Sequence, residues 1–318
     1  MEKTVTLCDS NRKACLQPFS PSDREIEQIV KQNKKMERMY HYTSMDVFYK
    51  LVEGIQDDCF SFRAGSVYTM NDRQEMIIGY EKIKAYLPQV EERLQVTEEE
   101  KISKLLLDTQ DNHEIADYFG EWMINDDTTN FAISFSASPD ILPMWTLYGG
   151  TGTGVCLEFS PYIIEKYYED KEEGKTMQIE HCVYKEADIE SFLLEKLEVL
   201  YGLYLRSNKD KKTSKVKARH IAVMCGVVGT FVKHPCYEYE QEIRLNTVRN
   251  KQSWNFIETR HHNQSVYVDF DIPTSALTGI IVGPATNYDK VKNSIVLMLS
   301  AKSLKIEPVH SHVPFRLY

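Results

Sequence analysis

The sequence predicts an α+β fold with a split, mostly antiparallel sheet and flanking helices. Several short segments, such as 131–136 (FAISFS), alternate apolar and polar residues with the two-residue period of half-buried strands. Other segments repeat apolar residues with the period of amphipathic helices. The two kinds follow one another without the regular strand–helix alternation that is typical of a parallel sheet. This irregular order of strands and helices is compatible with an antiparallel or split sheet.

Each expected element begins and ends at a turn signal or at a change of period. Thr43 or Ser44 caps the first helix and Gly54 ends it, and Asn71-Asp72 precede the second. The expected helices are 45–53, 73–87, 91–125, 187–205, 216–232 and 288–300. The expected strands are 39–42, 59–63, 131–136, 154–159, 179–184, 239–247, 266–270, 279–282 and 304–309.

The chain contains no linker rich in Pro, Gly or Ser that would divide it into domains. Residues 1–38 are polar and weakly periodic, with Pro18 and Pro21. We therefore expect a polar N-terminal arm over 1–38 and a single α+β domain over 39–318.

Composition narrows the class of protein. The 318 residues are 42% hydrophobic and 27% charged, which excludes a disordered or fibrous chain. The net charge of -9 argues against binding of duplex DNA over the whole surface. Seven cysteines without a CxxC pair indicate reduced thiols and a cytoplasmic location. The longest apolar run, 221–232, is too short to span a bilayer, and no signal peptide is evident, so we expect no membrane association.

Three local patterns favour structural roles. The run GGTGTG at 149–154 enters a strand and not a helix, so it predicts a hairpin turn with positive φ angles in preference to a phosphate cradle. The spacing of four clustered side chains matches no common zinc site, and we expect no metal. These side chains are His220, Cys225, His234 and Cys236. The segment Arg206–Arg219 holds seven Lys or Arg against one Asp, which is typical of a solvated loop or of a nucleic-acid contact.

Candidate functional side chains occur in three other segments. His41 ends a strand before a capped helix, where it either faces a cleft or bonds nearby backbone. Asn71, Asp72 and Glu75 are either ligands or acids, or part of a capping box. Strand alternation over 239–247 places three charged side chains on one face: Glu240, Glu242 and Arg244. That face is either a solvated surface or an acidic site whose arginine keeps a carboxylate ionised.

Seven segments in order resemble the bacterial family known as domain of unknown function 2971. They are YHYTS (40–44), MND..E (70–75), FAISFS (131–136), MWTLYGG (144–150) with GVCLEF after it, KHPCYEYEQEIRL (233–245), IIVGPATN (280–287) and HVPFR (312–316). The resemblance covers about 40–316. The biochemistry of that family is open.

A second resemblance links His41-Tyr42-Thr43 to the opening strand of ADP-ribosyltransferases. It implies that His41 holds the ribose of NAD and that Glu242 is the catalytic carboxylate, with Glu240 as its partner. It also implies that an aromatic side chain, Tyr68 or Tyr148, packs on the nicotinamide. The other side chains expected around the cofactor are Tyr42, Thr43, Asn71, Trp145 and Arg244.

These resemblances imply an NAD-dependent ADP-ribosyltransferase-like enzyme, of the glycosyltransferase class, in bacterial phage defence or as a toxin. Its acceptor would be nucleic acid, protein or water, and nucleic acid would bind at Arg206–Arg219. One alternative is a non-catalytic module on the same fold that binds NAD or another nucleotide, nucleic acid or a protein. Another is a metal-dependent hydrolase that uses His41, Asp72 and Glu75.

Overall fold

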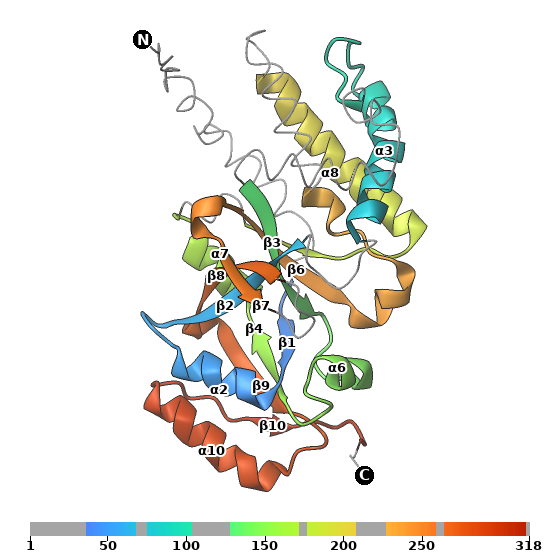
Figure 1. The fold of residues 1–318 in the computed structure, drawn as a ribbon. Coiled ribbons are helices and arrows are strands. Elements are labelled where there is room, and N and C mark those ends of the chain that lie inside the picture. The colour runs from blue at the N-terminus through green and yellow to red at the C-terminus, as the bar shows by residue number, and fades with distance from the viewer. Residues whose placement is uncertain are drawn as a thin grey trace, which may run out of the picture. The chain divides into compact units, whose positions relative to one another are not determined.

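The structure, a computed structural model, describes residues 36–67, 75–103, 128–171, 177–207, 227–258 and 264–315 (Figure 1). All of them belong to Met36–Tyr318, the second of two compact units. The first unit, Met1–Lys35, lies outside the described residues. It makes up most of the predicted N-terminal arm, 1–38.

An open sheet of ten strands organises the second unit, with the order β10-β9-β4-β1-β3-β2-β8-β7, β6 beside β3 and β5 beside β6. The strands are β1 (Met39–Thr43), β2 (Cys59–Ser66), β3 (Thr128–Ser136), β4 (Val155–Phe159), β5 (Gln178–His181), β6 (Glu242–Asn250), β7 (Asn255–Glu258), β8 (Gln264–Pro273), β9 (Leu277–Val282) and β10 (Val309–His310). Their pairing in the described residues is antiparallel except between β9 and β10. The predicted mixed fold with a mostly antiparallel sheet is confirmed.

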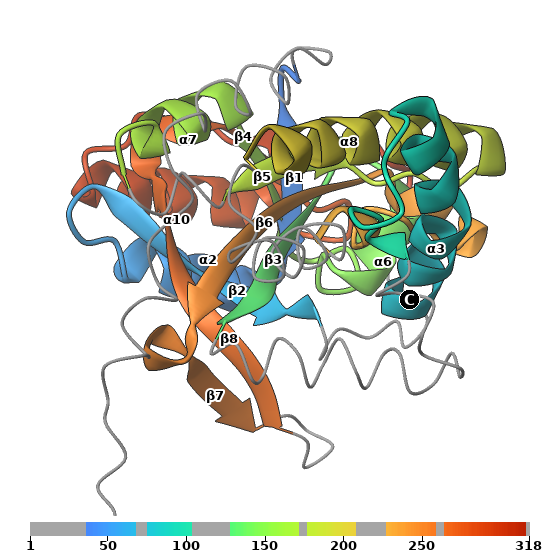
Figure 2. The same ribbon diagram turned by 90° about the horizontal axis from the view of Figure 1, so that it is seen from above.

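Strand β3 is where the sheet branches. One of its edges pairs with β6 over the whole length of the strand. Its other edge is shared, because β2 pairs at Phe131 and Ala132 and β1 pairs at Ser136. Figure 2 shows β2, β3 and β6 together, with the β7–β8 hairpin extending beyond the helices. The branch therefore places an N-terminal strand close to β6, which comes two hundred positions later in the chain.

One side of the sheet, the core face, is apolar. Helices α2 (Met45–Glu53), α7 (Pro161–Tyr168) and α10 (Tyr288–Ala301) contribute to its cluster through Phe48, Ile164 and Ile295. The strand side chains of the core face include Met39, Phe60, Phe62, Phe131, Ile133, Phe135, Leu157, Phe159, Ile243, Leu245, Val268 and Phe270. This cluster supplies most of the hydrophobic burial that holds the sheet.

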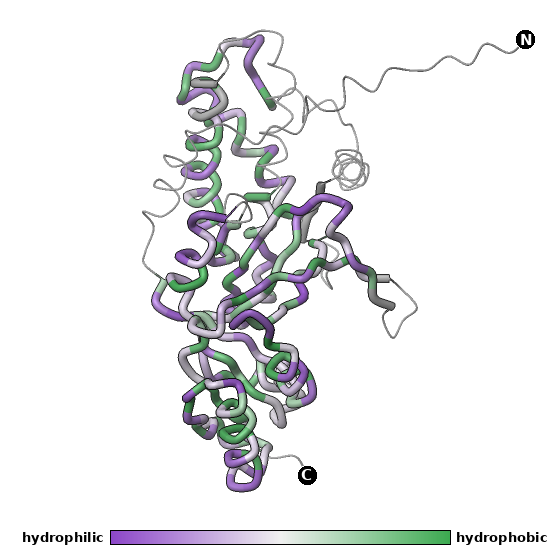
Figure 3. Tube along the Cα trace, turned by 90° about the vertical axis from the view of Figure 1, so that its left-hand side faces the viewer, coloured by the Kyte–Doolittle hydropathy of each residue, from purple (hydrophilic) through white to green (hydrophobic). Residues whose placement is uncertain are grey.

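The opposite side of the sheet, the polar face, is covered only in part. Strand β2 buries alternate residues and exposes Ser61 and Arg63 on this side. Elsewhere the helical elements α6 (Leu142–Leu147), α8 (Glu186–Ser207) and η5 (Pro235–Glu240) contribute side chains to it. Helix α8 packs along α3 (Glu75–Arg93) through an apolar cluster that includes Ile83, Val90 and Leu197 (Figures 1 and 2). Figure 3 shows hydrophobic and hydrophilic stretches alternating along these two helices, the pattern of helices with one buried side.

Several predicted boundaries are wrong. Helix α3 does not end at Leu87 but continues through Pro88 to Arg93, because Val90 is fully buried in the α3–α8 cluster. Residues 304–308 form no strand. Of the predicted helix 216–232, only 227–229 are helical in the described part, and Val232 makes an isolated bridge to Val183. None of the helices in the described part combines the length and apolar composition needed to cross a membrane.

Candidate functional site

Strand β6 carries alternating polar and apolar side chains, and the register with β3 shows which side each one occupies. Glu242 lies opposite Ser136, Arg244 opposite Ser134, and Asn246 opposite Ala132. Ile243, by contrast, lies opposite Phe135 on the core face. Successive strand residues point to opposite sides of a sheet. Glu242, Arg244 and Asn246 therefore share the polar face.

Glu240 reaches the same face by another route. The predicted strand start at residue 239 is wrong, because 235–240 form the 3-10 helix η5. Pro235 opens this helix, the His234 side chain accepts a hydrogen bond from the Cys236 amide, and Gln241 ends it with φ 44°. Proline favours the first turn of a helix, and a left-handed residue reverses the chain. The turn at Gln241 thus directs both glutamates toward one lysine.

Four side chains form a compact ionic cluster: Lys233, Glu240, Glu242 and Arg244. The Lys233 ammonium donates to Glu240 Oε2 at 2.7 Å and to Glu242 Oε2 at 2.6 Å. The Arg244 guanidinium donates from Nε to Glu242 Oε1 at 3.0 Å and from Nη2 to Glu242 Oε2 at 2.9 Å. This is the bidentate geometry of the strongest arginine–carboxylate pairs.

The ionic cluster is almost entirely removed from water. The side chains of Arg244 and Glu242 are 1% and 3% exposed. Burial raises the pKa of Glu242, but the charges of Arg244 and Lys233 outweigh it and lower that pKa to about 2. A hydrogen bond with the Ser134 side chain acts in the same direction. Glu242 is therefore ionised at neutral pH, and one partner alone would leave buried charge uncompensated.

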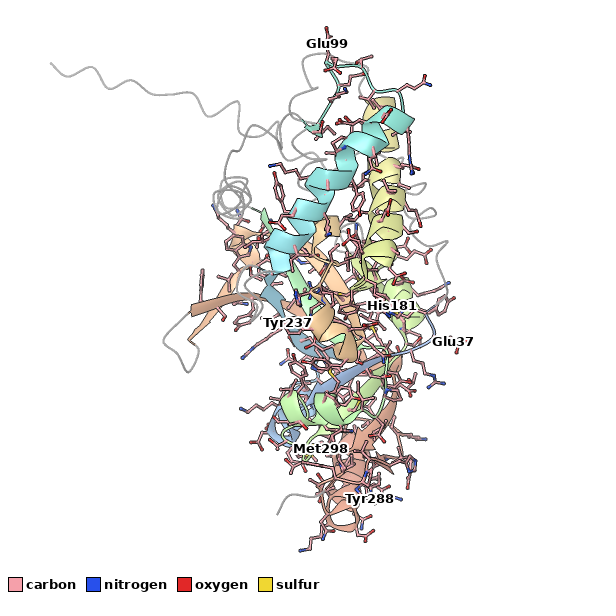
Figure 4. The ribbon with its side chains drawn as sticks, turned by 90° about the vertical axis from the view of Figure 1, so that its right-hand side faces the viewer. Glu37, Glu99, His181, Tyr237, Tyr288 and Met298 are labelled. Atoms are coloured by element: carbon pink, nitrogen blue, oxygen red, sulfur yellow. The ribbon has the colours of Figure 1, made fainter. Side chains whose placement is uncertain are left out.

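A second layer of polar groups holds the ionic cluster in place. The Tyr148 hydroxyl donates to Glu240 Oε1 at 2.7 Å, and the Glu242 amide donates to the Tyr184 hydroxyl at 2.8 Å. Arg244 Nη1 donates to the carbonyl of Thr230. The ring of Tyr237, labelled in Figure 4, lies 4.8 Å from the Lys233 ammonium, a favourable cation–π distance. The glutamates and cations are thus fixed from several elements at once.

The polar face opens to solvent beside the ionic cluster. Ser134 is exposed although its strand lies between β1 and β6, and its hydroxyl reaches the buried Glu242. Tyr148 is 43% exposed even though its hydroxyl contacts buried Glu240. Its burial and its hydrogen bond with Glu240 raise the pKa of Tyr148. Ser134 and the Tyr148 ring are therefore accessible to solvent while the cluster beneath them stays intact.

Tyr42 and Trp145 belong to a small apolar cluster on the polar face. Their rings make an edge-to-face contact with centroids 4.9 Å apart. The Trp145 indole donates to Asp140 Oδ1 at 2.6 Å, and the Tyr42 hydroxyl donates to the Ser138 carbonyl at 2.9 Å. Trp145 is fully buried, so it supports the site without presenting its own surface. Six predicted residues thus lie on or beside the polar face: Tyr42, Trp145, Tyr148, Glu240, Glu242 and Arg244.

His41 and Thr43 lie on the other side of the sheet. His41 sits between Phe62 and Phe135, with ring centroids 5.2 Å and 5.6 Å away. Its Nδ1 is 3.1 Å from the Ser134 carbonyl. Burial lowers the pKa of the imidazole, against the opposing effect of this hydrogen bond. The structure therefore does not bring His41 together with Glu242, and it shows the backbone contact that was the alternative expectation.

Other predicted residues lie outside the described part of the chain. These are Tyr68, Asn71, Asp72, the side chain of Glu75, residues 208–219 of the basic run Arg206–Arg219, His220 and Cys225. Their roles stay predictions. Within the described ranges, no group of three or more His, Cys, Asp or Glu could hold a metal ion.

The glycine-rich loop joins α6 to β4. Gly150 and Gly152 have φ angles of 60° and 82°, so the predicted positive φ is confirmed. The loop is not a hairpin, however, because a helix precedes it. A Cβ on Gly152 would lie 3.0 Å from the Phe315 ring, so this loop packs tightly against the C-terminal segment.

Two buried amides on the polar face have polar atoms that lack a hydrogen-bond partner among the described residues. Neither the nitrogen nor the oxygen of the Asn130 amide has one, and Asn246 Oδ1 has none. Asn130 is 1% exposed and Asn246 is fully buried. An unsatisfied buried polar group costs about 1–3 kcal/mol. Such groups in a native fold require an explanation.

The sequence carried signals for the residues that the prediction missed. Lys233 stands seven residues before Glu240, in a segment singled out only for its later residues. Ser134 falls at a polar position of an alternating strand, so its face was predictable. Asn130 and Asn246 are amides inside β-strands, where asparagine is depleted. Nothing in the sequence signals the contact of Thr230 with Arg244.

Comparison with curated proteins and with solved structures found no significant match. No comparison supports the similarity to ADP-ribosyltransferases. A family model described as "Protein of unknown function (DUF2971)" matches residues 144–245. This segment includes Trp145 and Tyr148 and ends just after Arg244. The match therefore supports the resemblance to the DUF2971 family over the segment that contains the whole ionic cluster.

Proposed function

We propose that this chain is a non-catalytic nucleotide-binding module whose site is the solvent-open part of the polar face beside Ser134 and Tyr148. The observation that carries this proposal is that each charged group of the ionic cluster is paired within the chain. The cluster serves as a rigid support for the binding surface.

The charge balance argues against a catalytic role for Glu242. Two cations, Lys233 and Arg244, face two carboxylates, Glu240 and Glu242, so the cluster sums to zero. Electrostatic catalysis of nicotinamide–ribose cleavage needs a carboxylate directed at the developing positive charge. Both oxygens of Glu242 already accept hydrogen bonds from Arg244. Its negative charge is therefore neutralised by Arg244 and is not directed at a substrate.

The open surface has chemistry that suits a nucleotide. Tyr148 offers a half-exposed ring. Any of the nucleobases can stack on such a ring, because each base has an aromatic face. The hydrogen bond with Glu240 restrains this ring. Ser134 offers an exposed hydroxyl on the same face. A ring that is already held in place loses little conformational entropy on binding.

Calorimetric titration of the full chain with NAD, ATP and GTP tests the proposal. We expect at least one nucleotide to bind, and Tyr148→Ala to weaken it about tenfold, since one base–aromatic stack contributes ~1–3 kcal/mol. Tyr148→Phe keeps the ring but loses its restraint by Glu240, so it should weaken binding less than Tyr148→Ala does. Tyr162→Ala removes a tyrosine on α7 that is 55% exposed, somewhat more than Tyr148, and serves as the control. Absence of binding by all three nucleotides would reject the module.

An NAD-dependent ADP-ribosyltransferase is the second candidate function, and one observation favours it. Glu242 is held ionised at neutral pH, as stabilisation of a sugar cation requires. Chromatographic assay of nicotinamide release from NAD separates the two candidates. Release that depends on Glu242 would support the enzyme, whereas nucleotide binding without release would support the module.

A further inference from the structure

Asn130 is a buried side chain that forms no hydrogen bond within the part of the chain that the structure describes. Both polar atoms of its amide are without a partner, although the residue is 1% exposed. Asparagine has low β-propensity, and a leucine or valine would fill the same position in β3 without leaving unmet polar groups. The fold itself therefore gives no reason for an amide here.

Asn246 provides a second unmet group close by. Asn130 lies opposite Val248 on β6, two residues beyond Asn246 on the same face. Diagonal neighbours of this kind are about 7 Å apart in an antiparallel pair. The two amides are thus close enough to contact one small molecule.

The hydrogen bonds of Thr230 fix which way the Asn246 amide points. The Thr230 hydroxyl donates to the Val227 carbonyl at 2.6 Å, so its oxygen accepts from Asn246 Nδ2 at 2.7 Å. Reversing the amide would place two acceptors together. Asn246 Oδ1 is therefore the acceptor that lacks a partner, while Asn130 offers an NH2 donor group and a carbonyl acceptor.

We propose that Asn130 and Asn246 bind the edge of a planar ligand that carries a hydrogen-bond donor beside an acceptor. A nucleobase and the carboxamide of nicotinamide both have this chemistry. Asparagine pairs with adenine through such an edge, using its amide oxygen and nitrogen together. This inference rests on the proposed nucleotide-binding function and assigns the amides to recognition of the base or carboxamide.

The position on the sheet agrees with this assignment. The same face is exposed at Ser134, on the same strand as Asn130. Four residues of extended strand span about 13 Å, which is comparable to the length of a nucleotide. A ligand whose one end meets the amides could extend toward Ser134.

Calorimetric titration of the full chain with two matched ligand pairs tests the proposal. Adenosine is compared with purine riboside, which lacks the exocyclic amine, and nicotinamide with nicotinate, which lacks the amide donor. We expect adenosine or nicotinamide to bind at least about tenfold more tightly than its partner, and Asn130→Leu to abolish that preference. The two pairs distinguish the base from the carboxamide. Asn130→Leu removes no hydrogen bond of the fold, so it should remain folded.

Asn250→Leu is the matched control, because Asn250 is exposed at the end of β6. It should leave both preferences unchanged. Nucleotide binding that Asn130→Leu does not alter would overturn this inference and leave the proposed function standing. Failure of all four ligands together with NAD, ATP and GTP would overturn both. A third outcome would also overturn the inference: none of the four ligands binds, and Asn130→Leu has a higher melting temperature than the wild type. The Asn130 amide would then be a buried polar group that destabilises the fold and binds no ligand.

Discussion

Adjacent residues of β6 are buried in two different chemical environments. Ile243 and Leu245 belong to the apolar cluster of the core face, whereas Glu242 and Arg244 are almost as deeply buried but as ions on the polar face. Apolar packing is tolerant, because it depends on volume and has no preferred direction. A buried ion pair depends on every partner being present. The same strand therefore combines a side that tolerates conservative change with a side that does not.

The largest expected effect contrasts Glu242 with its neighbour Ile243. Glu242→Gln replaces one oxygen but leaves Arg244 without a carboxylate, so the free energy of unfolding should fall by about 3–5 kcal/mol. Ile243→Val removes one methylene from the core face and should cost about 0.5–1.5 kcal/mol. Urea denaturation of both variants measures the difference. Equal losses would show that the two faces respond alike.

The hydroxyl of Tyr148 sharpens the comparison on the polar face. Tyr148→Phe removes only the donor to Glu240, and a hydrogen bond to a charged group contributes about 1.5–3 kcal/mol. Lys233 still neutralises Glu240, so we expect the lower end of that range in urea denaturation. Tyr162→Phe, at an exposed position of α7, should be neutral within about 0.5 kcal/mol. A Tyr148→Phe value as small as the control would mean that Glu240 does not need this donor.

Two helical glycines test how tightly α3 is held. A Cβ on Gly79 would lie 2.1 Å from the carbonyl oxygen of Gly229, whereas nothing lies within 4 Å of a Cβ on Gly202 of α8. Gly79→Ala should therefore destabilise by about 1–3 kcal/mol through overpacking. Gly202→Ala should stabilise by up to about 1 kcal/mol through helix propensity. Thermal unfolding gives both signs, and stabilisation by Gly79→Ala would contradict the close contact.

The smallest expected effect is on the pH dependence of stability, because the core face and the polar face contain groups that titrate in different pH ranges. Burial lowers the pKa of His41 below its usual 6.5, so the unfolded chain takes up this proton first and stability falls as pH drops below about 6.5. Glu242, whose pKa is lowered from 4.5 to about 2, affects stability only below about pH 4.5. Unfolding free energies measured at pH 7.5 and 5.5 should show a smaller loss in His41→Gln than in the wild type.

His312→Gln, at an exposed position, is the control for this pH dependence. It should keep the wild-type loss. An unchanged loss in His41→Gln would show that His41 does not cause it.

Local signals predicted the elements whose ends are set by their own residues. Helix 45–53 is found as α2, capped by Ser44, one of the two residues expected there, and 288–300 is found as α10 with one more residue. The polar alternation of Glu242 and Arg244 was also predicted, because it depends only on the period of a strand.

Other features depend on contacts that a single sequence does not reveal. Helix α3 passes through Pro88 because Val90 packs against α8. His41 and Glu242 were expected together because of the resemblance, but the pairing of β1 with β3 decides their faces. Lys233 contacts Glu240 because the chain turns at Gln241. A continuous strand over 239–247, as the sequence pattern predicted, would not contain this turn.

The ionic cluster also bears on how the chain folds, because its contacts are local. Lys233 is seven residues from Glu240 and nine from Glu242, and Arg244 is 14 from Thr230. Tyr148 and Glu240, by comparison, are 92 residues apart. The entropy lost on closing a loop grows with its length. Loop closure therefore favours a folding order in which the contacts within residues 230–244 form first, and this segment then docks onto β3. During synthesis this segment is complete before β7 to β10 have been made.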